Sequence, residues 1–381
     1  MTTISRFSRP LIVALALGAA ACTGHTGPAG DEPDAGSAPL PDGSAPPAAS
    51  GCAADGTGTD IVACGFGPSV GLVGASGRAV YALSAAGTYF RVDLDHGTTR
   101  LFHVGAPSSA LTTGLLGTVL ADDRIYFSTL VDQGRFASYG VVSIATTAPT
   151  SGDPRIVTLG DQTEPTGTVI ADATRLYMES TVFEPEGGAY VGPVVATGLG
   201  GSALTPITPD SGRPVAVVDD LLYYRHDAEL ARVGLDGSGR TVLAAAVAEN
   251  AANDRAVDAS GAYTTLASGP YAITRISPTG ATTLVVEASR GDVEITVGPP
   301  HDLRLADGAL YYLQDLGTDY AQLVRVRLTS AGPGVPETLF GGPGLAPPVF
   351  ADGVMYLAYT RGGYDAPIEG VIARFPAGPA S

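Results

Sequence analysis

The stretch Ala306-Asp307-Gly308-Ala309-Leu310-Tyr311 is one of seven copies of a short motif: an apolar residue, usually an Asp, a tight turn, then an apolar residue followed by Tyr. The seven motifs end at Tyr81, Tyr126, Tyr177, Tyr223, Tyr263, Tyr311 and Tyr356. Successive tyrosines are 45, 51, 46, 40, 48 and 45 residues apart. A period of about 46 residues with strand-like rather than helical patterning is typical of the blades of a β-propeller.

Each motif predicts one hairpin, because Asp caps its own turn through its side chain and Gly tolerates positive φ. A second hairpin follows in most units. For example, Leu230–Leu235 leads to Arg240–Leu243 with the alternation of apolar and polar residues that half-buried strands show. We therefore expect an all-β fold, a propeller of seven four-stranded blades, with six or eight blades as the alternatives. The only plausible short helix is Ala244–Asn253, and a loop between blades fits it equally well.

The first 22 residues have the features of an export signal. Arg6 and Arg9 precede the apolar run Leu11–Leu17, and the small residues Ala19-Ala20-Ala21 lead to Cys22. The apolar run is too short to span a bilayer as a helix. A Cys at the first mature position resembles the lipobox of bacterial lipoproteins, although Ala19 stands where Leu is usual. We expect residues 1–21 to be a lipoprotein signal peptide and Cys22 to carry the lipid, with ordinary secretion as the alternative.

Residues 22–51 hold little that can pack, since Gly, Pro, Ala, Ser and Asp dominate them. Such a segment buries too little apolar surface to offset the entropy of ordering. We expect a disordered, lipid-anchored linker over 22–51 and a folded body over 52–381. The protein would then lie in the bacterial cell envelope, at the outer membrane or cell surface.

The end of the chain lacks a strand. After Gly370–Phe375, the third strand of the last unit, only 376–381 remain, while the apolar segment Asp60–Cys64 precedes the first unit without a partner of its own. Because an unpaired edge strand invites aggregation, we expect Asp60–Cys64 to be the outer strand of the last blade and to close the ring. Cys52 and Cys64, an even pair in an exported chain, predict one disulfide that braces this closure.

The unit around Leu222-Tyr223-Tyr224 continues into Leu235-Asp236-Gly237-Ser238-Gly239-Arg240. This stretch resembles the YWTD repeat of low-density-lipoprotein receptors and of bacterial relatives of unknown function. The resemblance implies a Tyr-bearing strand inside each blade and, in the family, usually six blades. The Trp and the closing Asp of that motif are absent from every unit, as in Tyr126-Phe127-Ser128-Thr129, and seven units are present rather than six.

The charge of the chain excludes several functions. The formal net charge is −17, and it becomes −19 when the signal peptide leaves with Arg6 and Arg9 (−17 − 2). A surface this acidic repels phosphate backbones and anionic lipid headgroups. We therefore expect no nucleic-acid partner, and we expect membrane contact only through the lipid on Cys22. The chain has no Lys, which excludes Schiff-base chemistry.

No motif converges on a metal or a catalytic group. Equivalent turns of different blades lie too far apart to share one Ca²⁺ ion, so we expect the repeated Asp residues to be turn caps and no cofactor to be bound. These residues are Asp122, Asp172, Asp219, Asp258, Asp307 and Asp352. The histidines lack the spacing of a zinc site, and His226, which follows a Tyr pair, is the one we expect nearest the inner end of a blade. No Gly-x-Ser-x-Gly motif occurs.

Two functions remain open. The first is a non-catalytic, monomeric envelope protein that binds or scaffolds an unknown protein or glycan. The second is a propeller enzyme, a lactonase-like hydrolase or a lyase, with its site at the central channel; we favour the first. Two insertions, Phe183–Tyr190 and Thr360–Pro367, enlarge blade loops with exposed tyrosines and charges on what we expect to be one face. The candidate partner-binding residues in them are Glu184, Glu186, Tyr190, Arg361, Tyr364 and Asp365.

Overall fold

The computed structural model falls into two units, residues 1–45 and 46–381. It describes Cys52 and residues 60–94, 97–103, 117–132, 137–147, 155–160, 163–184, 188–248, 254–266, 272–287, 298–317, 319–363 and 366–376. The predicted signal peptide, Cys22 and the linker lie outside these residues. Within them, no helix is long and apolar enough to cross a membrane.

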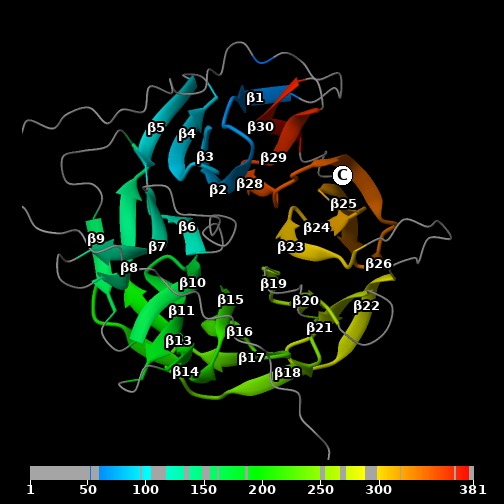
Figure 1. The fold of residues 1–381 in the computed structure, drawn as a ribbon. Helices are drawn as coiled ribbons and strands as arrows, with labels where there is room; N and C mark the ends of the chain where they lie inside the picture. The colour runs from blue at the N-terminus through cyan, green and yellow to red at the C-terminus, as the bar shows by residue number, and fades with distance from the viewer. Residues whose placement is uncertain are drawn as a thin grey trace, which may run out of the picture. The chain divides into compact units, whose positions relative to one another are not determined.

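Seven antiparallel sheets form the second unit, and they stand in a ring as a seven-bladed propeller (Figure 1). Blade 1 is β2 (Val70–Ser76), β3 (Ala79–Ser84), β4 (Thr88–Asp93) and β5 (Gly97–His103). Blade 2 is β6 (Thr118–Ala121), β7 (Arg124–Asp132), β8 (Ala137–Ala145) and β9 (Arg155–Leu159). Blade 3 is β10 (Thr163–Ala171), β11 (Arg175–Phe183), β13 (Pro193–Gly198) and β14 (Thr205–Ser211), with β12 (Ala189–Val191) paired to β11.

The other four blades follow in chain order. Blade 4 is β15 (Arg213–Val218), β16 (Leu221–His226), β17 (Glu229–Gly234) and β18 (Thr241–Ala245). Blade 5 is β19 (Ala256–Asp258), β20 (Gly261–Thr265), β21 (Ala272–Ile276) and β22 (Thr282–Glu287). Blade 6 is β23 (His301–Ala306), β24 (Ala309–Asp315), β25 (Tyr320–Thr329) and β27 (Glu337–Pro343), with β26 (Gly332–Pro333) paired to β25. Blade 7 is β28 (Val349–Ala351), β29 (Val354–Gly363), β30 (Ala366–Pro376) and β1 (Asp60–Cys64).

The repeat tyrosines build the core between blades. All seven are at most 4% exposed, and each belongs to a different apolar cluster that joins its own blade to the next one. Tyr311 of blade 6 packs with Leu357 of blade 7, whereas its chain neighbours Leu310 and Tyr312 pack toward blade 5. Successive side chains of a strand point to opposite faces, so a single Tyr strand contributes to two cores.

The Asp residues of the repeat act in two ways. Asp172 accepts hydrogen bonds from the Thr174 and Arg175 amides at 2.6 and 2.8 Å, and Asp258 caps its turn in the same manner, as predicted. Four others instead adopt positive φ themselves, between 45° and 50°, and the residue after each of them does so too. These four are Asp122, Asp219, Asp307 and Asp352. They form type I′ turns, which match the twist of the flanking strands and which Asp tolerates better than most residues.

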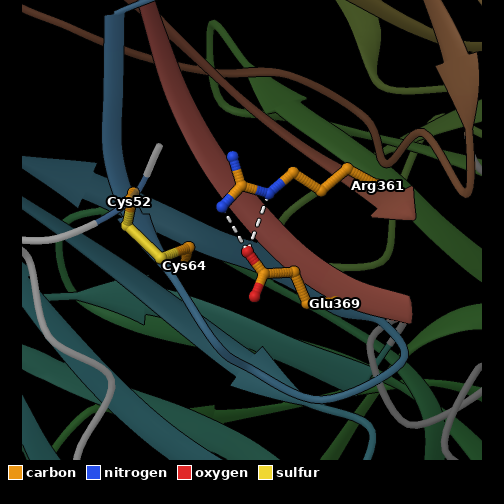
Figure 2. Close-up of a disulfide and its surroundings, with 4 residues drawn as sticks. All are labelled: Cys52, Cys64, Arg361 and Glu369. Atoms are coloured by element: carbon orange, nitrogen blue, oxygen red, sulfur yellow. Dashed lines mark hydrogen bonds and ion pairs between the residues drawn. A yellow bond between two sulfur atoms is a disulfide. The ribbon is translucent and has the colours of Figure 1, made fainter. Parts of the chain in front are cut away.

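The ring closes as the sequence predicts. β1 pairs antiparallel with β30, with Asp60 opposite Arg374 and Cys64 opposite Val371 (Figure 1). The Asp60 and Arg374 side chains form an ion pair across this junction. Cys52 and Cys64 form the expected disulfide, with Cα atoms 5.9 Å apart (Figure 2). The predicted alternative of a helix in Ala244–Asn253 is wrong where the structure describes it, because β18 extends to Ala245 and Val247 forms a β-bridge with Leu266.

Candidate functional site

The two faces of the ring carry different connections. Because neighbouring strands run antiparallel, every turn between the second and third strands of a blade lies on the same face as every connection between blades; we call this the connection face. The opposite face, here the turn face, carries the Asp-containing turns and the hairpins between the third and fourth strands.

Long hairpins make the connection face uneven. β7, β8 and β11 have 9 residues each, and β29 and β30 have 10 and 11, whereas β3 and β16 have 6. The predicted loop Thr360–Pro367 is strand at every residue that the structure describes in it, and in Phe183–Tyr190 the strands reach Phe183 on one side and begin at Ala189 on the other. The extended β7–β8 hairpin of blade 2 was not predicted.

Exposed apolar side chains gather on this face. The structure describes ten large apolar side chains as exposed, and six of them lie toward the connection-face ends of their strands. These are Tyr139, Phe183, Tyr190, Val191, Tyr320 and Ile368. Ile156, Val242 and Leu284 lie on outer strands instead, and Val335 lies in a turn-face hairpin. Exposed apolar side chains grouped with polar ones mark interaction surfaces more often than isolated ones do.

A cleft of about 440 Å³ opens on the connection face where blade 3, with its long hairpin, meets blade 4. Its lining residues are Glu179, Val191, Ser211, Gly212, Arg213, Arg225 and Asp227. Val191 belongs to β12 and is 50% exposed, so the long hairpin supplies an apolar wall above a charged floor. The volume lies in the range of small-ligand sites, which usually combine apolar walls with a few polar groups.

Arg213 and Glu179 join the two blades at the floor of the cleft. Arg213 Nε donates to Glu179 Oε2 at 2.9 Å, and Nη2 donates to Oε1 at 3.5 Å. The Thr168 amide also donates to Glu179 at 3.4 Å. Gly167 makes room for this carboxylate, because a Cβ there would lie 2.5 Å from Oε2. The Arg213 side chain remains 34% exposed, so part of its guanidinium faces the cleft.

Arg225 brings a second cation to the same place. It lies opposite Arg213 in the β15–β16 register, and its Nη2 donates to the Ala248 carbonyl at 2.9 Å. Like charges at directly opposed positions are unfavourable, and Glu179 offsets this repulsion on the Arg213 side. Asp227, in the turn after β16, is 88% exposed and adds a carboxylate at the rim.

Ser211 and His226 meet beside the cleft, but they do not form a nucleophile and base. His226 Nδ1 lies 2.8 Å from the Ser211 carbonyl oxygen and 3.1 Å from Ser211 Oγ. A carbonyl only accepts hydrogen bonds, so Nδ1 carries the proton and cannot take one from the hydroxyl. The contact therefore holds the ring in place. Within the described part of the chain, no group of three or more His, Cys, Asp or Glu residues is placed to hold a metal ion.

The predicted site residues are only partly brought together. Glu184 and Tyr190 lie at the tip of the blade 3 hairpin, exposed, and the Glu184 amide donates to the Gly188 carbonyl at 2.8 Å. Arg361 lies on blade 7, with blades 1 and 2 between it and blade 3. Its Nε donates to Glu369 at 2.7 Å, so it ties β29 to β30 (Figure 2). Glu186, Tyr364 and Asp365 lie outside the described residues.

Sequence reasoning missed most of the cleft. The sequence points to His226, which lies at the connection-face end of β16, but it does not point to Glu179, Arg213 or Arg225. One signal was available for Glu179: it stands two residues after Tyr177 and so shares the strand face that points to the next blade.

Comparisons with solved structures support the fold alone. No protein-family model and no curated protein matches the chain. A puromycin-hydrolysing peptidase from Mycobacterium tuberculosis is similar over 82% of this chain and 51% of its own, with 13% identity and a TM-score of 0.50. A nidogen–laminin complex is similar over 70% of this chain and 92% of its own, with 13% identity and a TM-score of 0.42. A computationally designed protein, Ika8, is similar over 82% and 99%, with 11% identity and a TM-score of 0.41.

Proposed function

We propose that the protein is a non-catalytic, lipid-anchored binding protein of the bacterial cell envelope, and that the connection face of its propeller holds a protein or glycan partner. The observation that carries the proposal is the exposed apolar edge of the blade 3 hairpin, Tyr190 and Val191, next to the charged cleft of Arg213, Glu179 and Asp227, which Val191 lines. Tyr190 and Val191 offer flat apolar contact at low entropic cost, and the charged groups offer oriented hydrogen bonds.

Export and anchoring rest on the sequence signal at Arg6, Arg9 and Cys22. A lipid on Cys22 contributes about 0.8 kcal/mol per buried methylene, and two or more chains hold a protein stably on a membrane. The linker 22–51 then separates the propeller from the bilayer.

Crosslinking and affinity recovery from intact cells test the proposal. The wild-type chain is compared with Tyr190→Ser/Val191→Ser, which removes the exposed apolar side chains of β12, including Val191 in the cleft wall, and with Ile156→Ser/Val242→Ser, which removes exposed apolar groups from outer strands elsewhere. We expect the wild type and the outer-strand variant to fractionate with membranes and recover the same partner, and the hairpin variant to lose it. Equal recovery by the hairpin variant, or wild-type protein in the soluble fraction, contradicts the proposal.

A further inference from the structure

Five of the repeat tyrosines face an arginine on the third strand of their blade. The pairs in register are Tyr81 with Arg91, Tyr223 with Arg232, Tyr263 with Arg275, Tyr311 with Arg325, and Tyr356 with Arg374. The ring thus places one guanidinium at an equivalent position in five blades, and their surroundings can be compared directly.

Three of these arginines have a carboxylate of their own. Arg91 Nη2 binds Asp93 at 3.0 Å and Arg325 Nη2 binds Glu337 at 2.7 Å; Arg374 pairs with Asp60. In blades 6 and 7 the acid comes from the fourth strand, at the position directly opposite the arginine.

Blade 5 has no acid at the corresponding position of its fourth strand. The residue opposite Arg275 on β22 is Thr283, and Arg275 Nε is buried without a hydrogen-bond partner among the described residues. Arg325 Nε also lacks one, but its guanidinium is held by Glu337. A buried donor on a charged group is costly to leave unpaired, so an acceptor at Arg275 stabilises the folded protein.

A pocket of about 180 Å³ lies at this arginine, between blades 5 and 6. Its lining includes Arg275, Thr283 and Leu284 of blade 5 and Leu328, Thr329 and Ser330 of blade 6. The extra strand β26 forms one wall, because Leu328 pairs with Pro333 and Thr329 with Gly332. The pocket combines one cation and several hydroxyls with an apolar side, and it lies at the turn-face end of β25, away from the connection face.

We propose that this pocket binds the carboxylate of a small acid with an apolar body. The ligand carboxylate takes the place that Glu337 and Asp60 occupy in blades 6 and 7, and it accepts charge-assisted hydrogen bonds from Arg275. The apolar body contacts Leu284 and Leu328. A dry cavity of roughly 150 Å³ holds a benzene molecule, so this pocket takes an acid of about the size of hexanoate or benzoate.

Thermal unfolding and calorimetric titration of the full chain with sodium hexanoate test the inference, with hexanol and inorganic phosphate as comparison ligands. We expect hexanoate to raise the melting temperature and the other two to leave it unchanged. Arg275→Met should weaken hexanoate binding about tenfold or more, because the carboxylate loses at least one charge-assisted hydrogen bond. Arg232→Met is the matched control, because Arg232 holds the same position in blade 4, also opposite a threonine, and lines neither of the two described pockets. This variant should bind hexanoate as the wild type does.

Thr283→Glu gives a second, independent readout. It supplies within the chain the carboxylate that Glu337 supplies in blade 6, so it should raise the melting temperature and abolish hexanoate binding. Equal stabilisation by hexanol or by phosphate, undiminished binding in Arg275→Met, or hexanoate binding to Thr283→Glu at wild-type affinity would each overturn the proposal.

Discussion

Asp254 shows how one residue reports on the packing between blades. It precedes β19 in blade 5 and is 4% exposed. Its Oδ1 accepts a hydrogen bond from the Leu303 amide of blade 6 at 3.1 Å, and its Oδ2 accepts one from Thr264 Oγ1 at 3.2 Å. Burial raises the pKa of Asp254 to about 7, with the nearby Asp302 adding to the rise and the Leu303 amide and Arg304 opposing it.

Replacing this acid should change how stability depends on pH. The folded-state pKa of Asp254 lies above the unfolded value of about 4. Its contribution to the free energy of unfolding is therefore fully present below about pH 4, is lost as the pH rises from about 4 to about 7, and does not change further above about pH 7. Asp254→Asn keeps an acceptor for Leu303 and removes the titration. We expect the variant to match the wild type near pH 4 and to exceed it by a few kcal/mol at pH 8.

Urea unfolding at pH 4, 5.5 and 8 measures this difference. A variant less stable than the wild type at pH 8 would show that Asp254 is ionised in the folded protein and paired with the nearby, partly buried Arg304. The prediction therefore separates a buried neutral acid from a buried ion pair.

At the scale of elements, the same residue type has opposite roles in equivalent turns. Asp220 has φ of 60° at the second position of a type I′ turn, a conformation that Gly adopts without strain. Asp172 instead binds two backbone amides, and it accepts a hydrogen bond from Tyr177 Oη at 2.7 Å. Burial tends to raise the pKa of Asp172, but these hydrogen bonds outweigh burial and hold the pKa below its ordinary value.

One substitution should therefore have opposite signs in the two turns. We expect Asp220→Gly to stabilise the protein by about 0.5 kcal/mol, because it relieves positive φ. Asp172→Gly should destabilise it by about 1 to 2 kcal/mol, because the turn loses its cap. Guanidinium unfolding of both variants checks the pair, and a shift of the same sign in both would contradict the distinction between the turns.

The long hairpins illustrate the limit of prediction for elements. The sequence identifies Phe183–Tyr190 and Thr360–Pro367 as insertions with exposed tyrosines, yet paired strands extend into both, as far as the Phe183–Ala189 pair in the first and the Gly363–Ala366 pair in the second. Short alternating segments on either side of a tip do not reveal whether they pair, since pairing depends on the neighbouring strand. β10 supports β11 out to the Thr163–Val182 pair, and this support was not visible in the repeat.

At the scale of the whole molecule, the closure between β1 and β30 holds both ends of the ring. The Cys52–Cys64 disulfide spans 12 residues and ties the last residue of the closing strand β1 to Cys52. Cys52→Ser/Cys64→Ser should cost about 3 kcal/mol and lower the melting temperature, because the unfolded chain regains loop entropy. Asp60→Asn, which removes only the exposed ion pair with Arg374, should cost less than about 1 kcal/mol. Calorimetry of the two variants measures both changes in stability, and calorimetry of the wild type with reductant repeats the test of the disulfide. A double cysteine variant as stable as the wild type would show that the disulfide does not brace the ring.

The order of the residues by itself determined the architecture. The tyrosine period, the missing fourth strand after Gly370–Phe375 and the unpaired Asp60–Cys64 together specify seven blades and their closure, because each blade is a local unit that repeats a local pattern. Only the tertiary structure decided which charges meet. Glu179 of blade 3 contacts Arg213 of the neighbouring blade 4, and Arg275 has a threonine rather than an acid opposite it. Such contacts depend on side-chain distances between neighbouring sheets, and no periodicity along the chain encodes those distances.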